Sequence, residues 1–268
     1  MWLELFLAVC LSVPNSSESL PEVEFIEDGP QTYRFTCEYK QSDADDAFGG
    51  KQRIDATYTR GLPDGRVEWD GGSMARGAEL EGEYPESGQA LDYLSPFGYD
   101  ARQSYAMFTP AFFEGFPTTL AATYSKNLVW DTHMLEQFGR SYFGELRLNE
   151  PYAVSGPSSP SVPLAGMGAF KNRRIELTWI GRSERHGEPC ALIRYEAFFN
   201  TFDMRVAGTG IDGLSHYWGL IWVSLEDKQL EHGTLNEHVS LRVHRTGAAP
   251  THAHVLRTGT LTHILSEK

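Results

Sequence analysis

The stretch SHYWGLIWVSLEDKQLEHGTLNEHVSLRVH, residues 215–244, decides the fold class of this chain. In its second half Leu235, Val239 and Leu241 share one side of an extended chain, and polar residues alternate with them. A period of two residues is typical of a strand with one buried and one solvated face. The polar residues 226–228 separate this run from an apolar run before it, so we predict a long antiparallel hairpin.

The same period recurs elsewhere in the chain. It is found in QTYRFTCEY (31–39), RIELTWIG (174–181) and ALIRYEAFF (191–199). The polar segment SERHGEP separates the last two, which indicates a second hairpin. TGAAPT (246–251) then returns the chain into HVLRTGTLTHIL (254–265), so the last hundred residues are predicted to form an antiparallel meander.

Two segments lack this alternation. Residues 100–140 have no sustained period and are predicted to hold one or two short helices that lie across the sheet. Residues 149–168 are rich in Pro, Ser and Gly, which indicates a loop. A sheet with one apolar face must cover that face. We therefore predict a mainly β protein: a curved antiparallel sheet or half-open barrel, with a few short helices covering its concave face.

The start of the chain has the character of a leader. An apolar run at residues 5–13 is followed by small polar residues, so we interpret residues 1–19 as a signal-like leader and 20–268 as a single β-rich domain. This predicts a secreted or periplasmic protein without a transmembrane segment, because the run is too short to cross a bilayer. Cys10, in LAVC, is a candidate for lipidation, although Val9 stands where a small residue is expected.

Charge and cysteine content narrow the possible partners and chemistry. The formal net charge of -13 disfavours nucleic-acid binding and docking on anionic membranes. Once the leader is removed, Cys37 and Cys190 remain, which is enough for one disulfide but does not show that the two are close. The chain contains no GxSxG, HExxH or glycine-rich phosphate loop.

The signal-like start, the strands IELTWIG and ALIRYEAFF, and the hairpin YWGLIWVSLEDKQLEHGTLNEHV together resemble the half-barrel of the bacterial periplasmic lipoprotein carriers and their lipoprotein relatives. The resemblance is architectural and covers about the last hundred residues. It implies a sheet that holds acyl chains or another apolar ligand on its concave face. The family's binding residues have no sequence signature that could be transferred to this chain.

Aromatic residues are the candidates for lining such a pocket. The candidates are Trp179, Tyr195, Tyr217, Trp218 and Trp222. Core packing is the alternative for these side chains, because apolar pockets and cores use the same residue types. Glu237 interrupts the apolar face of its strand, so it either has a raised pKa and a function or forms a salt bridge with Arg194 or Arg205.

The stretch WDTHMLEQFG (130–139) is the candidate for catalysis. Asp131, His133 and Glu136 could form an acid–base relay or hold a metal ion, as in a hydrolase. The alternative is the start of an ordinary helix, with Asp131 or Thr132 as its N-cap and Gly139 at its end.

Histidines in the last predicted hairpin offer a second candidate for metal binding. A turn centred near Ala249 would place His244 opposite His252 and His254, close enough for zinc or copper. We expect no other cofactor. The main expectation is a protein that binds an apolar small molecule or lipid, and the alternatives are a hydrolase and a structural surface domain without a ligand.

Overall fold

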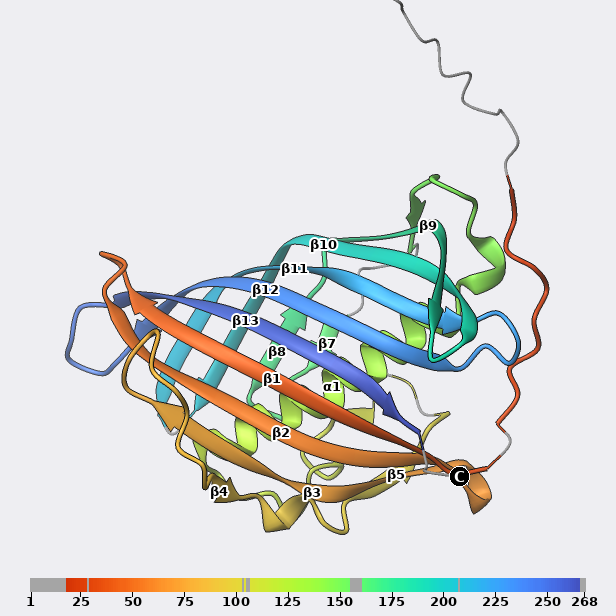
Figure 1. The fold of residues 1–268 in the computed structure, drawn as a ribbon. Helices are drawn as coiled ribbons and strands as arrows, with labels where there is room; N and C mark the ends of the chain where they lie inside the picture. The colour runs from red at the N-terminus through yellow and green to blue at the C-terminus, as the bar shows by residue number, and fades with distance from the viewer. Residues whose placement is uncertain are drawn as a thin grey trace, which may run out of the picture.

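The computed structural model describes residues 18–265, except 28, 103, 105–106, 155–160 and 207. The signal-like leader and Cys10 therefore lie almost entirely outside the described residues. The described part forms a 13-stranded antiparallel sheet with one long helix on its concave side (Figure 1), which confirms the predicted mainly β fold.

The sheet is built from two groups of strands. The N-terminal group comprises β1 (Gln31–Asp43), β2 (Phe48–Leu62), β3 (Arg66–Gly77), β4 (Gln89–Ala90) and β5 (Gly98–Asp100). The C-terminal group comprises β6 (Tyr152–Ala153), β7 (Ser161–Pro163), β8 (Gly168–Lys171), β9 (Arg174–Arg185), β10 (Glu188–Val206), β11 (Thr209–Ser224), β12 (Leu230–His244) and β13 (Thr251–Ile264). Helix α1 (Leu120–Arg140) lies between the groups, and 3-10 turns in the described part of the chain cover Pro63–Gly65, Asp92–Leu94 and Phe143–Glu145.

The first and last long strands join the two groups. The order along the sheet is β4-β3-β2-β1-β13-β12-β11-β10-β8-β7, with β1 and β13 hydrogen-bonded along almost their whole length. In the described part of the chain the sheet stays open and is not a closed barrel. The three predicted hairpins are confirmed as the pairs β9–β10, β11–β12 and β12–β13.

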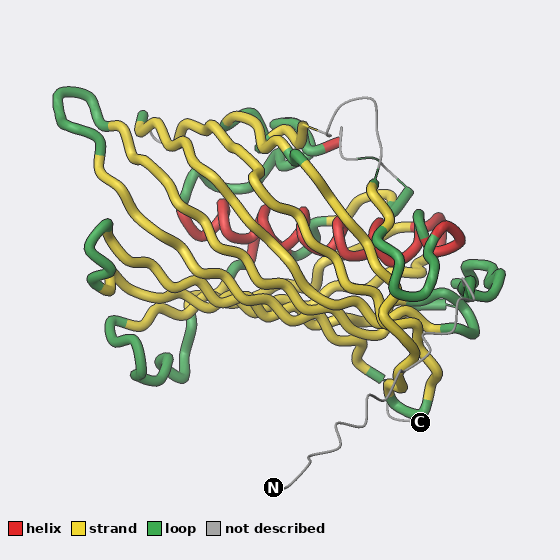
Figure 2. The backbone as a smooth tube through the Cα atoms, turned by 90° about the horizontal axis from the view of Figure 1, so that it is seen from above, coloured by secondary structure: helices red, strands yellow, loops and turns green. Residues whose placement is uncertain are grey.

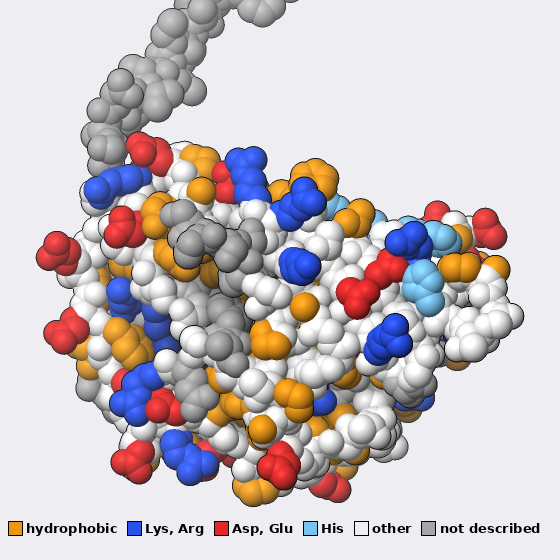
Figure 3. Space-filling view, turned by 180° about the vertical axis from the view of Figure 1, so that it is seen from behind, with side chains coloured by type: hydrophobic (Ala, Val, Ile, Leu, Met, Phe, Trp, Pro, Cys, Tyr) orange, Lys and Arg blue, Asp and Glu red, His pale blue; other side chains and the backbone are white. Residues whose placement is uncertain are grey.

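Alternation along the strands produces the concave core. In β1 the side chains of Tyr33, Phe35, Cys37 and Tyr39 are buried, while the residues between them are partly exposed. Successive side chains of a strand point to opposite faces, so this row faces the interior. Side chains of both charge signs are scattered among apolar ones on the side seen from behind (Figure 3).

A bulge in β10 divides this strand into two parts that pair with different neighbouring strands. The register with β11 shifts between Ala197 and Asn200, and Phe199 has a positive φ of 60°. A bulge bends its strand. The first part of β10 pairs with β9, and the part after the bulge pairs with β8. Asn200 is buried there and donates to the Ala197 carbonyl.

Helix α1 crosses the concave face (Figures 1 and 2). Its N-cap is Thr119, whose hydroxyl accepts a hydrogen bond from the Ala122 amide. The predicted helix start at Asp131 or Thr132 is wrong, since both residues lie in the second half of a 21-residue helix. Thr132 donates its hydroxyl hydrogen bond to the Leu128 carbonyl instead of capping.

Two further features concern the cysteines and membranes. Cys37 and Cys190 are both buried as free thiols, so the disulfide that the sequence allowed is not formed. Within the described residues, the structure has no helix that is long and apolar enough to span a membrane.

Candidate functional site

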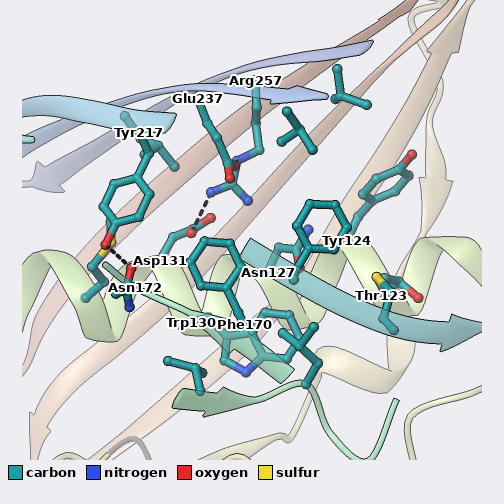
Figure 4. A pocket seen from close by; sticks show the side chains of 18 of the residues that line it. Thr123, Tyr124, Asn127, Trp130, Asp131, Phe170, Asn172, Tyr217, Glu237 and Arg257 are labelled. Atoms are coloured by element: carbon teal, nitrogen blue, oxygen red, sulfur yellow. Dashed lines mark hydrogen bonds and ion pairs between the residues drawn. The ribbon is translucent and has the colours of Figure 1, made fainter. Parts of the chain in front are cut away.

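A cavity of about 380 Å³ lies between α1 and the concave face of the sheet (Figure 4). Most of its lining is apolar and comes from strands β10–β13, from one side of the helix, and from β7 and β8. Representative lining residues are Met134, Phe138, Phe170, Val239, Leu241 and Val255.

One wall of the cavity carries a buried group of three charged side chains. Arg257 on β13 contacts Asp131 on α1 at 2.7 Å and Glu237 on β12 at 2.9 Å. The Ser215 hydroxyl donates to the other oxygen of Glu237 at 2.5 Å. Figure 4 shows that Asp131 on the helix points toward Arg257, whose side chain extends from the sheet. We call Asp131, Glu237 and Arg257 the cavity triad.

The partner expected for Glu237 is corrected by the structure. Arg257 is its direct neighbour in the register of β12 and β13, so both charges point into the concave side. Arg194 instead forms an ion pair with Glu196, and Arg205 is exposed. The buried charge is thus paired, as the cost of an isolated buried carboxylate requires.

Asp131 has the most unusual environment within the cavity triad. Burial raises its pKa to about 6, even though the neighbouring Arg257 guanidinium lowers it. Only one carboxylate oxygen, Oδ1, receives the hydrogen bond from Arg257. The other oxygen, Oδ2, is buried and has no hydrogen-bond partner among the described residues.

Glu136 belongs to a separate buried cluster at the far end of α1. Arg60 on β2 contacts it at 2.7 Å, Arg140 lies 3.7 Å away, and the Tyr58 hydroxyl donates to it at 3.1 Å. Burial raises the pKa of Glu136, but the two guanidinium groups outweigh burial and the net pKa is lowered. Glu136 does not line the cavity.

The three residues proposed for catalysis therefore do not meet at one point. Asp131 and Glu136 are five positions apart, which places them about 140° apart around the helix axis. His133 is buried with its ring edge-on to Phe108, at 5.6 Å between ring centroids, and burial lowers its pKa. His133 interacts electrostatically with Glu136, whereas Asp131 faces the cavity.

The predicted aromatic lining is divided between the two faces of the sheet. Tyr217 lines the cavity, where its hydroxyl donates to Asn172 at 2.8 Å. Trp218 is 40% exposed, and Trp222 packs against His232 on the outer face. Positions 218 and 222 have the opposite parity to 217, so the pleat turns them away from the concave side.

Tyr195 and Trp179 are core residues beside the cavity. Tyr195 is fully buried against Phe138, and its hydroxyl donates to the Thr234 carbonyl at 2.7 Å. Trp179 is also buried, and its indole N–H donates to the Gly181 carbonyl at 2.6 Å. Neither residue lines the cavity.

The three histidines of the last hairpin also lie apart. Val243 pairs with Thr251, so the turn is centred before the predicted position and His244 lies beyond the paired part of the hairpin. His244 instead contacts Asp212 at 2.6 Å, and His254 stacks on His238. His252 pairs with Arg242. In the described ranges, no group of three His, Cys, Asp or Glu side chains could hold a metal ion.

Some residues that line the cavity were not among the candidates predicted from the sequence. Arg257 interrupts the inward row of β13 just as Glu237 interrupts that of β12, and this matching pair of inward charges was the available signal. Val162, Leu164 and Phe170 come from a segment interpreted wholly as loop or from the short strand after it. Strands of three or four residues are too short to show a period.

The fold and the cavity define a general class, namely an open, curved antiparallel sheet that encloses an apolar cavity with one helix. No model of a known protein family matches the chain, and no curated protein sequence matches it. Among solved structures, a DUF1329 family protein from Desulfovibrio piger is similar at 6% identity and a TM-score of 0.17. That match covers 90% of this chain and 89% of the other. These values establish neither a shared family nor a shared function.

Proposed function

We propose that the protein binds an apolar or lipid-like small molecule in the cavity between α1 and the concave face of the sheet. The supporting observation is the cavity itself, which has a volume of about 380 Å³ and a mostly apolar lining. Sites for small molecules are typically concave and apolar, hold a few polar groups, and have volumes of roughly 300–1,000 Å³. The cavity triad supplies such polar groups at one wall.

The alternative of an acid–base hydrolase is less well supported by the same geometry. Asp131 and Glu136 are each paired with an arginine, and they face different parts of the molecule. A relay requires groups within hydrogen-bond reach of one another or of one bound substrate. The alternative of a structural domain without a ligand leaves the cavity without a role.

We further propose that the protein acts outside the cytoplasm, as a secreted or periplasmic binding protein. The support is the apolar run at residues 5–13. Cell fractionation and N-terminal sequencing of the mature protein test this location. A cytoplasmic protein that retains its first residues would contradict it.

Ligand binding is tested with protein stripped of lipid and titrated with Nile red, a neutral apolar dye. We expect saturable binding, and we expect Val239→Phe to weaken it at least about tenfold because the larger ring occupies the cavity. Leu256→Phe is the matched control, since Leu256 is 55% exposed on the next strand and does not line the cavity. Equal dye binding by both variants, or none by the wild type, would contradict the proposal.

A further inference from the structure

The cavity triad is unbalanced in charge. It contains one guanidinium and two carboxylates, whose side chains are 9% or 10% exposed. When both acids are ionised, the group carries a net charge of -1 beside an apolar cavity. Electrostatic interactions are much stronger in such surroundings than in water. A ligand with an anionic end would therefore be repelled, whereas an end that donates a hydrogen bond would be attracted.

The triad is also incomplete in its hydrogen bonds. The Ser215 hydroxyl donates to one oxygen of Glu237, and Arg257 Nε lies 2.9 Å from the other as an ion pair. Arg257 donates a hydrogen bond to Oδ1 of Asp131. The remaining oxygen, Asp131 Oδ2, is buried without a donor among the described residues. A buried carboxylate oxygen that lacks a donor is costly, and a donor supplied by a ligand would remove that cost.

We propose that the cavity takes an apolar molecule whose polar end is a hydroxyl group, that this hydroxyl donates to Asp131, and that the cavity discriminates against carboxylates such as fatty acids. This inference rests on the proposed binding function and names the class of its ligand. A hydroxyl fits better than an ammonium group, because burying a neutral donor costs far less than burying a charge. Asp131 is therefore the residue that determines specificity.

The test compares three ligands with the same alkyl chain length at pH 8. They are 1-dodecanol, which donates a hydrogen bond, its methyl ether, which only accepts, and dodecanoate, which is anionic. The two neutral ligands are kept below their solubility limits in water, and the anionic one below its critical micelle concentration. Their affinities are measured by displacement of Nile red. We expect 1-dodecanol to bind about tenfold or more tightly than either of the others, the size expected for one hydrogen bond to a charged group.

Two variants separate the hydrogen bond from the charge. Asp131→Asn should abolish the preference for the alcohol over the ether and should strengthen dodecanoate binding. Glu237→Gln should also strengthen dodecanoate binding but should keep the preference for the alcohol, because Asp131 remains. Glu136→Gln is the matched control, since it neutralises a buried acid of the same helix outside the cavity. It should leave the ranking of the three ligands unchanged.

The outcomes distinguish this inference from the proposed function. Displacement by all three ligands with equal affinity, or tightest binding of dodecanoate, would overturn the preference for a hydroxyl while leaving apolar binding intact. An unchanged ranking in Asp131→Asn would overturn the role of Asp131. Displacement by none of the three would overturn the preference for a hydroxyl, whereas the absence of saturable Nile red binding would remove both proposals. Should Asp131→Asn fail to fold, the wild-type ranking and Glu237→Gln still decide.

Discussion

The three residues of the cavity triad show, at the scale of single residues, what a sequence pattern can and cannot predict. The inward position of Glu237 followed from alternation within its own strand, and the structure confirms that it is paired. Its partner and the contact with the helix depend on which strand lies beside which. Arg257 contacts Asp131 across more than a hundred residues of chain, and no local period carries that information.

The raised pKa of Asp131 predicts a specific dependence of stability on pH. Its folded pKa of about 6 lies above the ordinary value of 3.8, so between these two values the folded state binds more protons than the unfolded state. The contribution of Asp131 to stability is therefore fully present below about pH 4 and is lost as pH rises through 6. We expect Asp131→Asn to flatten the fall in melting temperature across this range. Identical slopes for the variant and the wild type would refute this assignment.

At the scale of the element, the long strands β1 and β9–β13 were predicted, whereas β2, β3 and the start of the helix were not. Each predicted strand carries its own alternation, which reports its buried face directly. Threonine, a residue type that can cap a helix, stands at both position 119 and position 132, and sequence alone does not rank the two. Packing decides between them, because the apolar residues of α1 on both sides of Thr132 are buried beneath the sheet.

Close packing between strands predicts a strict requirement for glycine at position 219. A Cβ atom there would clash with the Thr234 carbonyl oxygen and lie 2.7 Å from the Tyr195 hydroxyl. We expect Gly219→Ala to lower the free energy of unfolding by about 1–3 kcal/mol, the usual cost of overpacking. Gly144→Ala is the control, because nothing lies within 4 Å of its added Cβ atom. Urea denaturation of both variants checks this, and equal midpoints would contradict it.

At the scale of the whole molecule, the sequence predicted the meander of the last hundred residues but not how the first strands join it. The contacts between β1 and β13 link segments from opposite ends of the described chain. The cavity depends on the same arrangement, since β1 and β13 both contribute lining residues. A hollow formed between segments so far apart in sequence leaves no local pattern.

The central position of β13 predicts that the sheet cannot form without it. A chain that ends after residue 245 loses one of the two pairing partners of β1 and of β12, together with Arg257. We expect this truncated protein to lack a cooperative unfolding transition in circular dichroism. A chain that ends after residue 265 keeps β13 and serves as the control. A cooperative transition in the shorter chain would show that the remaining strands fold independently.

The pairing of β1 with β13 also governs how this protein is made. A ribosome releases β1 long before β13 has been synthesised, so during translation one edge of β1 has no strand to bind. Unpaired strand edges attract other chains, and contacts between distant segments form slowly. Each nascent chain therefore passes through an interval in which it is prone to aggregate, and this interval ends when its last strand arrives.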